Sequence, residues 1–81
     1  MNQVELVSVA DLLKELSEDT GLPKNIKERI ADILDILSEE KDVSLKVNKA
    51  IHEIEKVVDD RNLQAYTRTQ LFNIISALES V

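Results

Sequence analysis

Apolar residues recur along this chain at the three- and four-residue spacing of an amphipathic helix, in four separate segments. The predicted helices cover residues 3–18, 23–39, 43–59 and 64–80. Their apolar stripes are Leu6, Val9, Leu13 and Leu16; then Ile26, Ile30, Ile33, Leu34 and Leu37; then Val43, Val47, Ala50, Ile51, Ile54, Val57 and Val58; and finally Leu71, Ile74, Ile75 and Leu78. Each stripe needs a partner to cover it, so the pattern favours an all-α fold.

The boundaries between these segments carry ordinary helix-ending and helix-starting residues. Gly21 is the residue type that most readily takes the left-handed conformation closing a helix. Pro23 is favoured as a first helical residue, because its missing N–H has no partner there. Asp42 is a good N-cap for the third helix. All three connections are therefore expected to be short.

The longest run without a charged residue, residues 69–78, lies in the last helix. One side of it is the apolar stripe, and the other carries the neutral polar residues Thr69, Asn73 and Ser76. A helix that is uncharged all round is typical of a central position in a fold or of half an interface. The pattern therefore predicts that this helix lies at the driest place in the protein.

The chain matches itself at an offset of 41 residues (63 − 22), which places Gly21 on Asn62. The matched pairs are Leu13 with Ile54, Leu16 with Val57, Asp19 with Asp60, Leu22 with Leu63, Lys27 with Arg68, Ile30 with Leu71, Ile33 with Ile74, Leu34 with Ile75 and Leu37 with Leu78. Helical periodicity alone also generates such matches. We interpret the pattern as two similar helical hairpins, because their turns align as well as their stripes. Two hairpins are too few for a solenoid, and an antiparallel four-helix bundle in a single domain, residues 1–81, is expected.

The two halves differ in charge on one helical face. The acidic stripe of the second helix maps onto neutral residues of the fourth: Glu28, Asp32, Asp35 and Glu39 fall on Thr69, Asn73, Ser76 and Ser80. We predict that this face is solvated on the second helix and drier on the fourth, where neutral polar residues in water are the alternative. The candidate interface residues are Thr69, Phe72, Asn73, Ser76 and Ser80.

Two motifs resemble a family of small archaeal proteins catalogued as uncharacterised protein family 0147. They are LPKNIKERIADIL in the first half and YTRTQLFNIISALES at the end. The resemblance implies a four-helix bundle and an archaeal origin, and it implies no activity. The chain departs from the family pattern at Gln64, where a proline is expected, and at Phe72, where a larger aromatic residue is expected. The internal repeat is also loosely similar to HEAT repeats, through Asp19 and Asp60 in its turns.

Composition and charge narrow the classes of partner. The net charge of −6 disfavours nucleic acid and anionic membranes. The absence of cysteine excludes disulfides and thiolate metal sites. No apolar run approaches the roughly 20 residues of a membrane span, and the first residues lack the basic segment of a secretory signal. We expect a cytoplasmic protein without a membrane anchor.

Few residues suggest chemistry. His52 is isolated and expected on the surface, because no carboxylate at ligand spacing accompanies it. Tyr66 is expected to be a half-buried anchor. The acidic stripe of the second helix could bind a divalent cation, although one helix face presents carboxylates in a row and not convergently. A basic cluster near the two turns, Lys24, Lys27, Arg61 and Arg68, could contact nucleic acid, but neighbouring carboxylates are expected to pair with it.

The sequence therefore predicts no catalytic, cofactor-binding or metal-binding residue. The function it favours is a non-enzymatic interaction or scaffold module that binds a protein partner or a second copy of itself. The alternatives are a nucleic-acid-associated protein using the basic cluster, and a divalent-metal carboxylate site on the second helix.

Overall fold

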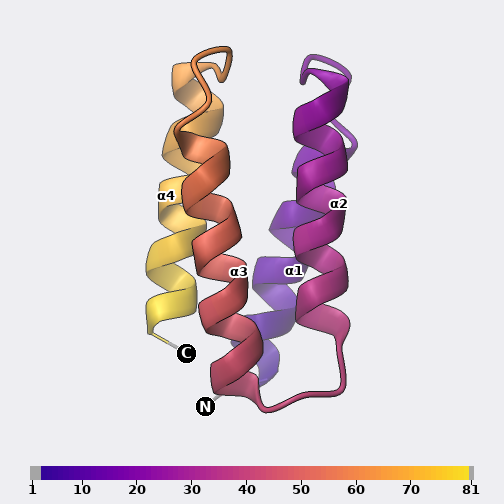
Figure 1. Cartoon of the computed structure of the whole chain (residues 1–81), viewed down its shortest axis with the longest axis vertical. Helices are drawn as coiled ribbons and strands as arrows, with labels where there is room; N and C mark the ends of the chain where they lie inside the picture. The colour runs from indigo at the N-terminus through magenta and orange to yellow at the C-terminus, as the bar shows by residue number, and fades with distance from the viewer. Residues whose placement is uncertain (1–2, 81) are drawn as a thin grey trace.

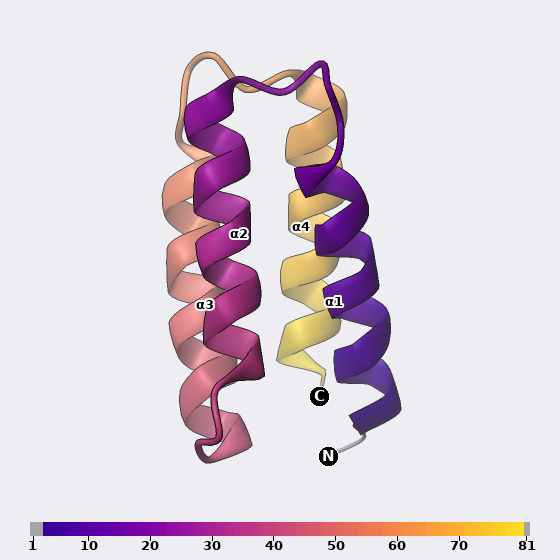
Figure 2. The ribbon, with the colours of Figure 1, turned by 90° about the vertical axis from the view of Figure 1, so that its right-hand side faces the viewer.

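Four helices of nearly equal length run antiparallel to one another (Figures 1 and 2). The computed structural model describes residues 3–80. Its helices are α1 (Gln3–Ser17), α2 (Lys24–Ser38), α3 (Val43–Val58) and α4 (Ala65–Glu79). Each helix packs on two neighbours, α1 on α2 and α4, and α3 on α2 and α4, and within residues 3–80 no diagonal pair is in contact. The predicted antiparallel four-helix bundle is confirmed.

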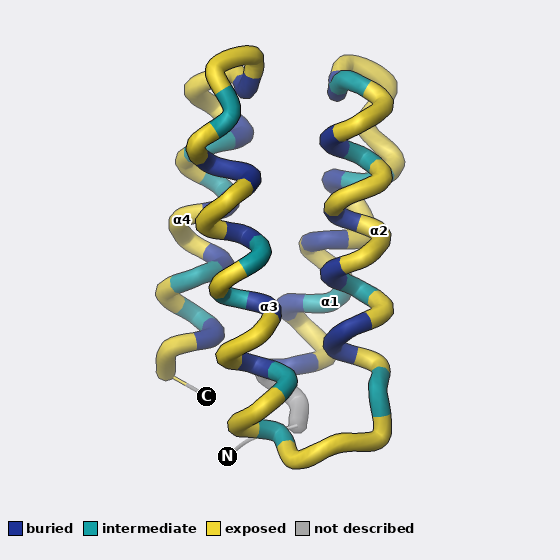
Figure 3. The backbone as a smooth tube through the Cα atoms, viewed as in Figure 1, coloured by how far each residue is buried: buried dark blue, intermediate teal, exposed yellow. Residues whose placement is uncertain are grey.

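The core fills the space between the four apolar stripes, as the burial pattern in Figure 3 shows. Ile30 and Leu71, which are matched at the offset of 41, are both fully buried. Every buried residue of α2 except Ile36 has a buried counterpart in α4. One counterpart differs in chemistry: Thr67 is buried where α2 places Ile26. The bounds of α4 also fall 41 residues after those of α2, so the two hairpins match in their helices as well as in their burial.

The two turns that close the hairpins share one hydrogen-bond pattern and lie at the same end of the bundle (Figure 2). Asp19 Oδ1 accepts the Gly21 N–H at 2.8 Å, and Asp60 Oδ1 accepts the Asn62 N–H at 2.8 Å. The carbonyl of each aspartate accepts a further N–H three residues on, at 3.2 Å in both turns. Aspartate commonly builds turns of this kind, and here it sets the reversal of both hairpins.

The prediction that Gly21 closes a helix in the left-handed conformation is wrong, and so is the parallel expectation for Asn62. Within residues 3–80 neither Gly21 nor any other residue has a positive φ. The aspartate side chain in each turn supplies the acceptor that turns the chain, so a left-handed residue is not required.

The starts of α2 and α4 each lie one residue after the predicted one, and the predicted N-cap of α3 is confirmed. Pro23 and Gln64 are the extended residues just before α2 and α4, with ψ of 146° and 147°. Their carbonyls accept the N–H groups of Lys27 and Arg68 at 3.1 and 3.0 Å. Gln64 therefore precedes α4 in the same way as Pro23 precedes α2, although it lacks the proline ring. Asp42 caps α3 as predicted, because its Oδ1 accepts the Ser44 N–H at 2.9 Å.

Substituting Gly21 by asparagine is expected to change the free energy of unfolding by no more than about 1 kcal/mol, because a side chain at a compatible φ restricts the unfolded chain. A Cβ at Gly21 would meet Asp19 Oδ1 at 3.2 Å, and the matching turn carries a side chain at Asn62 with the same backbone hydrogen bond to aspartate. Urea denaturation measures the change. The reverse substitution, Asn62→Gly, is the control and is expected to destabilise by up to about 1 kcal/mol. A larger loss for Gly21→Asn would contradict the equivalence of the two turns.

Candidate functional site

The outer side of α4 from Ala65 to Ser76 is the most unusual surface of the molecule, because it is exposed and carries no formal charge. We call it the neutral α4 face and define it by exposed residues: Ala65, Tyr66, Thr69, Phe72, Asn73 and Ser76. Because α4 packs only on α1 and α3, its outward side has no helix over it. The prediction that this side of α4 is drier than the matching side of α2 is therefore wrong for the single chain. The proposed role of Thr69, Phe72, Asn73 and Ser76 in an interface stays a prediction.

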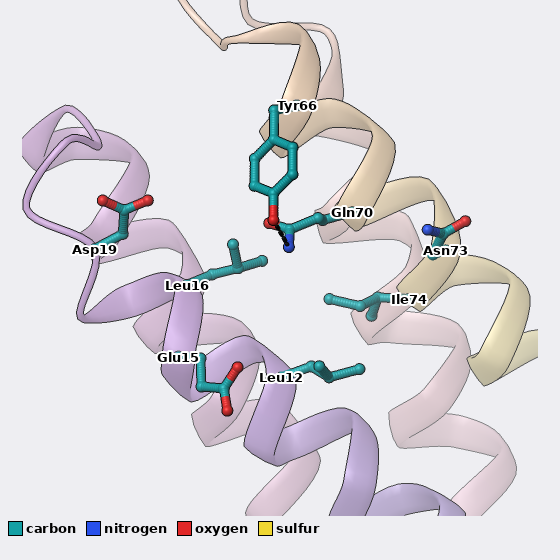
Figure 4. Close-up of a pocket in the computed structure, with 8 residues that line it drawn as sticks. All are labelled: Leu12, Glu15, Leu16, Asp19, Tyr66, Gln70, Asn73 and Ile74. Carbon is teal, nitrogen blue, oxygen red and sulfur yellow. Dashed lines mark hydrogen bonds between the residues drawn. The ribbon is translucent and has the colours of Figure 1, made fainter.

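Both aromatic residues of the chain lie on the neutral α4 face. Tyr66 is 70% exposed and Phe72 is 50% exposed. The prediction of a half-buried Tyr66 is wrong, because its ring stands out from the first turn of α4 on the side toward α1 and is left open to solvent (Figure 4). Aromatic side chains have large apolar area to bury and are enriched in interfaces. Both aromatic side chains of α4 are therefore left open to solvent in the single chain.

An intrahelical hydrogen bond of Thr69 makes the neutral α4 face more apolar than its sequence suggests. The hydroxyl of Thr69 donates to the carbonyl of Ala65 at 3.1 Å, so its polar atom is already paired within the helix. Ser80, the fifth residue predicted for the interface, lies just beyond α4 and is exposed; its hydroxyl donates to the carbonyl of Ala77 at 2.9 Å.

A groove with a volume of about 390 Å³ runs between α1 and α4, beside the neutral α4 face (Figure 4). Leu12, Leu16 and Ile74 form its apolar lining, and Tyr66 stands at one end of it. The amide of Gln70 donates to the Tyr66 hydroxyl at 3.0 Å, which fixes the phenol ring over the groove. The groove was missed by the sequence reasoning, because its walls come from the first and last helices.

The amide oxygen of Gln70 is buried in the wall of the groove without a hydrogen-bond partner among the described residues. Buried acceptors are normally paired. The Gln70 oxygen is therefore an unpaired acceptor beside the Tyr66 hydroxyl.

The face of α2 that matches the neutral α4 face is acidic. Glu28, Asp32 and Asp35 are exposed there, as predicted for a solvated stripe. Glu39, the fourth member of the predicted stripe, lies apart from them at the end of α2. It forms ion pairs with Lys41 at 2.8 Å and Lys49 at 3.9 Å.

The hydrogen bond and charge of Lys41, with a smaller effect of Lys49, hold the pKa of Glu39 below its usual value. Within residues 3–80 no group of three or more His, Asp and Glu side chains is placed to hold a metal ion. His52 is exposed on α3, as predicted.

The basic cluster predicted near the turns is brought to one end of the bundle, but Arg68 has a structural role there. Its guanidinium donates to the carbonyls of Val58 and Asp60, both at 3.0 Å, and so pairs groups at the end of α3. Lys24 and Arg61 are exposed, and Lys27 is partly buried. The predicted pairing of this cluster with neighbouring carboxylates is wrong: over the described chain, ion pairs form only on Glu39 and Glu53.

The comparisons with known proteins identify the family. The model of the uncharacterised protein family UPF0147 matches residues 1–81. The chain belongs to this family.

Its archaeal relatives include a protein from Thermoplasma volcanium that is 34% identical, with 100% of this chain and 92% of the relative covered. A protein from Methanocaldococcus jannaschii is also 34% identical, with 94% and 83% covered. A crystal structure of the protein of unknown function MMP1188 matches with a TM-score of 0.93 at 29% identity. It covers 100% of this chain and 93% of that one.

The family resemblance predicted from the two motifs is confirmed, and its fold with it. The family carries no assigned function, so the function of this chain must be argued from its surface. None of the helices within residues 3–80 combines the length and hydropathy that a bilayer crossing requires.

Proposed function

We propose that this protein is a non-enzymatic interaction module that binds a protein partner through the neutral α4 face. The observation that carries the proposal is the exposure of both aromatic residues of the chain, Tyr66 and Phe72, on a helix face without charge. In water, burying exposed aromatic surface against a partner is favourable by about 25 cal/mol for each Å². A charge-free surface also avoids the desolvation cost that carboxylates would impose.

The contrast between α2 and α4 supports this assignment. The two helices occupy matching places in matching hairpins, and their inward residues are almost equally buried. Their outward faces differ: α2 presents Glu28, Asp32 and Asp35, whereas α4 presents Thr69, Asn73 and Ser76. Bundle stability depends mainly on the inward residues. We therefore attribute the difference in charge between the two outward faces to binding. The groove between α1 and α4 adjoins the same surface through Tyr66 and Asn73, and its α1 side carries the carboxylates of Glu15 and Asp19.

The matched helices supply a controlled test of partner binding. Phe72→Arg introduces a charge at the centre of the neutral α4 face, and Ala31→Arg introduces the same charge at the matching exposed position of α2. We expect a protein captured from extracts of the native cell by the unaltered chain and by Ala31→Arg to be lost with Phe72→Arg. Circular dichroism shows whether both variants are folded. Equal capture by the two variants would contradict the proposal.

A further inference from the structure

The middle of the neutral α4 face has the residue spacing of a helix–helix contact seam. Ala65, Thr69, Phe72 and Ser76 follow one another at intervals of four, three and four residues and are all exposed. This alternation is the a/d spacing by which two helices pack knobs into holes. One large side chain, Phe72, lies between the smaller Thr69 and Ser76. The seam therefore presents one large side chain, with space beside it for a large side chain of a second helix.

This seam is complementary to itself when reversed. If two copies of α4 pack antiparallel about a twofold axis between residues 70 and 71, Phe72 of each copy lies opposite Thr69 of the other. In the same arrangement Ala65 of each copy lies opposite Ser76 of the other. Each large side chain then meets a small one, and the same patch serves both copies, as a twofold interface requires.

We propose that the occupant of the neutral α4 face is a second copy of this chain, paired antiparallel in this register. The inference rests on the proposed function and names its partner. Charge supports it: with a net charge of −6, two copies repel through acidic faces such as that of α2. Across the neutral α4 face no carboxylate opposes another. Glu79, the next residue along the seam, falls beyond Ala65, where α4 of the second copy begins.

The size of the seam sets the strength of the pairing. A 15-residue helix is about 22 Å long, and one face of it is smaller than the roughly 800 Å² that each partner buries in a standard interface. The flanking side chain of Tyr66 and the exposed Leu12 of α1 add apolar area beside the seam. A reversible dimer with a micromolar dissociation constant is expected, and not a permanent one.

Cysteine cross-linking tests the register, because the chain has no cysteine of its own. We expect a mixture of Ala65→Cys and Ser76→Cys chains, treated with a short bis-maleimide, to yield mainly mixed dimers that link position 65 to position 76. Each variant alone should cross-link weakly. Efficient linking of position 76 to itself would show parallel pairing, and equally poor linking in every mixture would show that this seam does not pair; either result overturns the proposal.

Sedimentation equilibrium at millimolar concentration tests the pairing itself without new thiols. The unaltered chain and Ala31→Arg should dimerise, and Phe72→Arg should weaken dimerisation by about 30-fold or more, as expected for an interface hot spot. A monomeric unaltered chain overturns the self-pairing. If that monomer still captures a cellular protein in a Phe72-dependent way, the proposed function stands and only the identity of the partner fails.

Discussion

Replacing Leu71 by alanine is expected to lower the free energy of unfolding by about 2–5 kcal/mol, the range for removing a buried leucine side chain. Leu71 is 0% exposed and lies at the middle of α4 on its inward side. The substitution removes apolar contacts and leaves a cavity in the core, which the surrounding buried side chains cannot fully fill. In a small domain, whose total stability is about 5–15 kcal/mol, this is a large fraction. Urea denaturation followed by circular dichroism measures it.

The next residue along the chain is the control for this prediction. Phe72 has a larger side chain than Leu71 but is 50% exposed, so Phe72→Ala is expected to cost less than about 1 kcal/mol at concentrations where the chain is monomeric. Comparable losses at both positions would mean that α4 does not present these residues to opposite sides, as the bundle requires.

Replacing Arg68 by alanine is expected to cost about 1.5–3 kcal/mol of stability, the range for hydrogen bonds to charged groups. The guanidinium donates to the carbonyls of Val58 and Asp60 at the end of α3, and the side chain is partly buried. Its positive charge also lies at the negative end of the helix dipole of α3. Thermal unfolding of the two proteins measures the difference.

Lys27 is the matched control, since it lies 41 residues before Arg68 and donates no comparable hydrogen bond within the described chain. Lys27→Ala is expected to change the stability by about 0.5 kcal/mol or less. A loss for Arg68→Ala as small as that for Lys27→Ala would show that the two carbonyls are equally well paired by water.

Most of the fold could be predicted from local pattern. The helix spacing alone placed the stripes of Leu13, Ile30, Ile54 and Leu71, and all four of these residues are fully buried. The self-match at 41 residues placed both turns, because Asp19 and Asp60 act on atoms only two or three residues away. Most features determined by neighbours in the chain are readable from it; the backbone conformation of Gly21 and Asn62 is the exception.

Three of the errors have a common cause. The dryness expected around Thr69, the burial expected for Tyr66 and the ion pairs expected for Arg68 all depend on which elements lie across from these residues. Hydrophobic spacing shows which side of a helix faces inward, but it does not show what covers the other side. In this bundle each helix has only two neighbours, so the outer side of α4 is exposed although it is uncharged.

By itself, the sequence determined four amphipathic helices, their two aspartate turns and the family, because these depend on periodicity and on contacts close along the chain. Only the tertiary structure decided that the neutral side of α4 faces outward with both aromatic residues, that a groove separates α1 from α4, and that Arg68 pairs carbonyls of α3. Those features join segments far apart in the chain, and the packing of the helices is what brings them together.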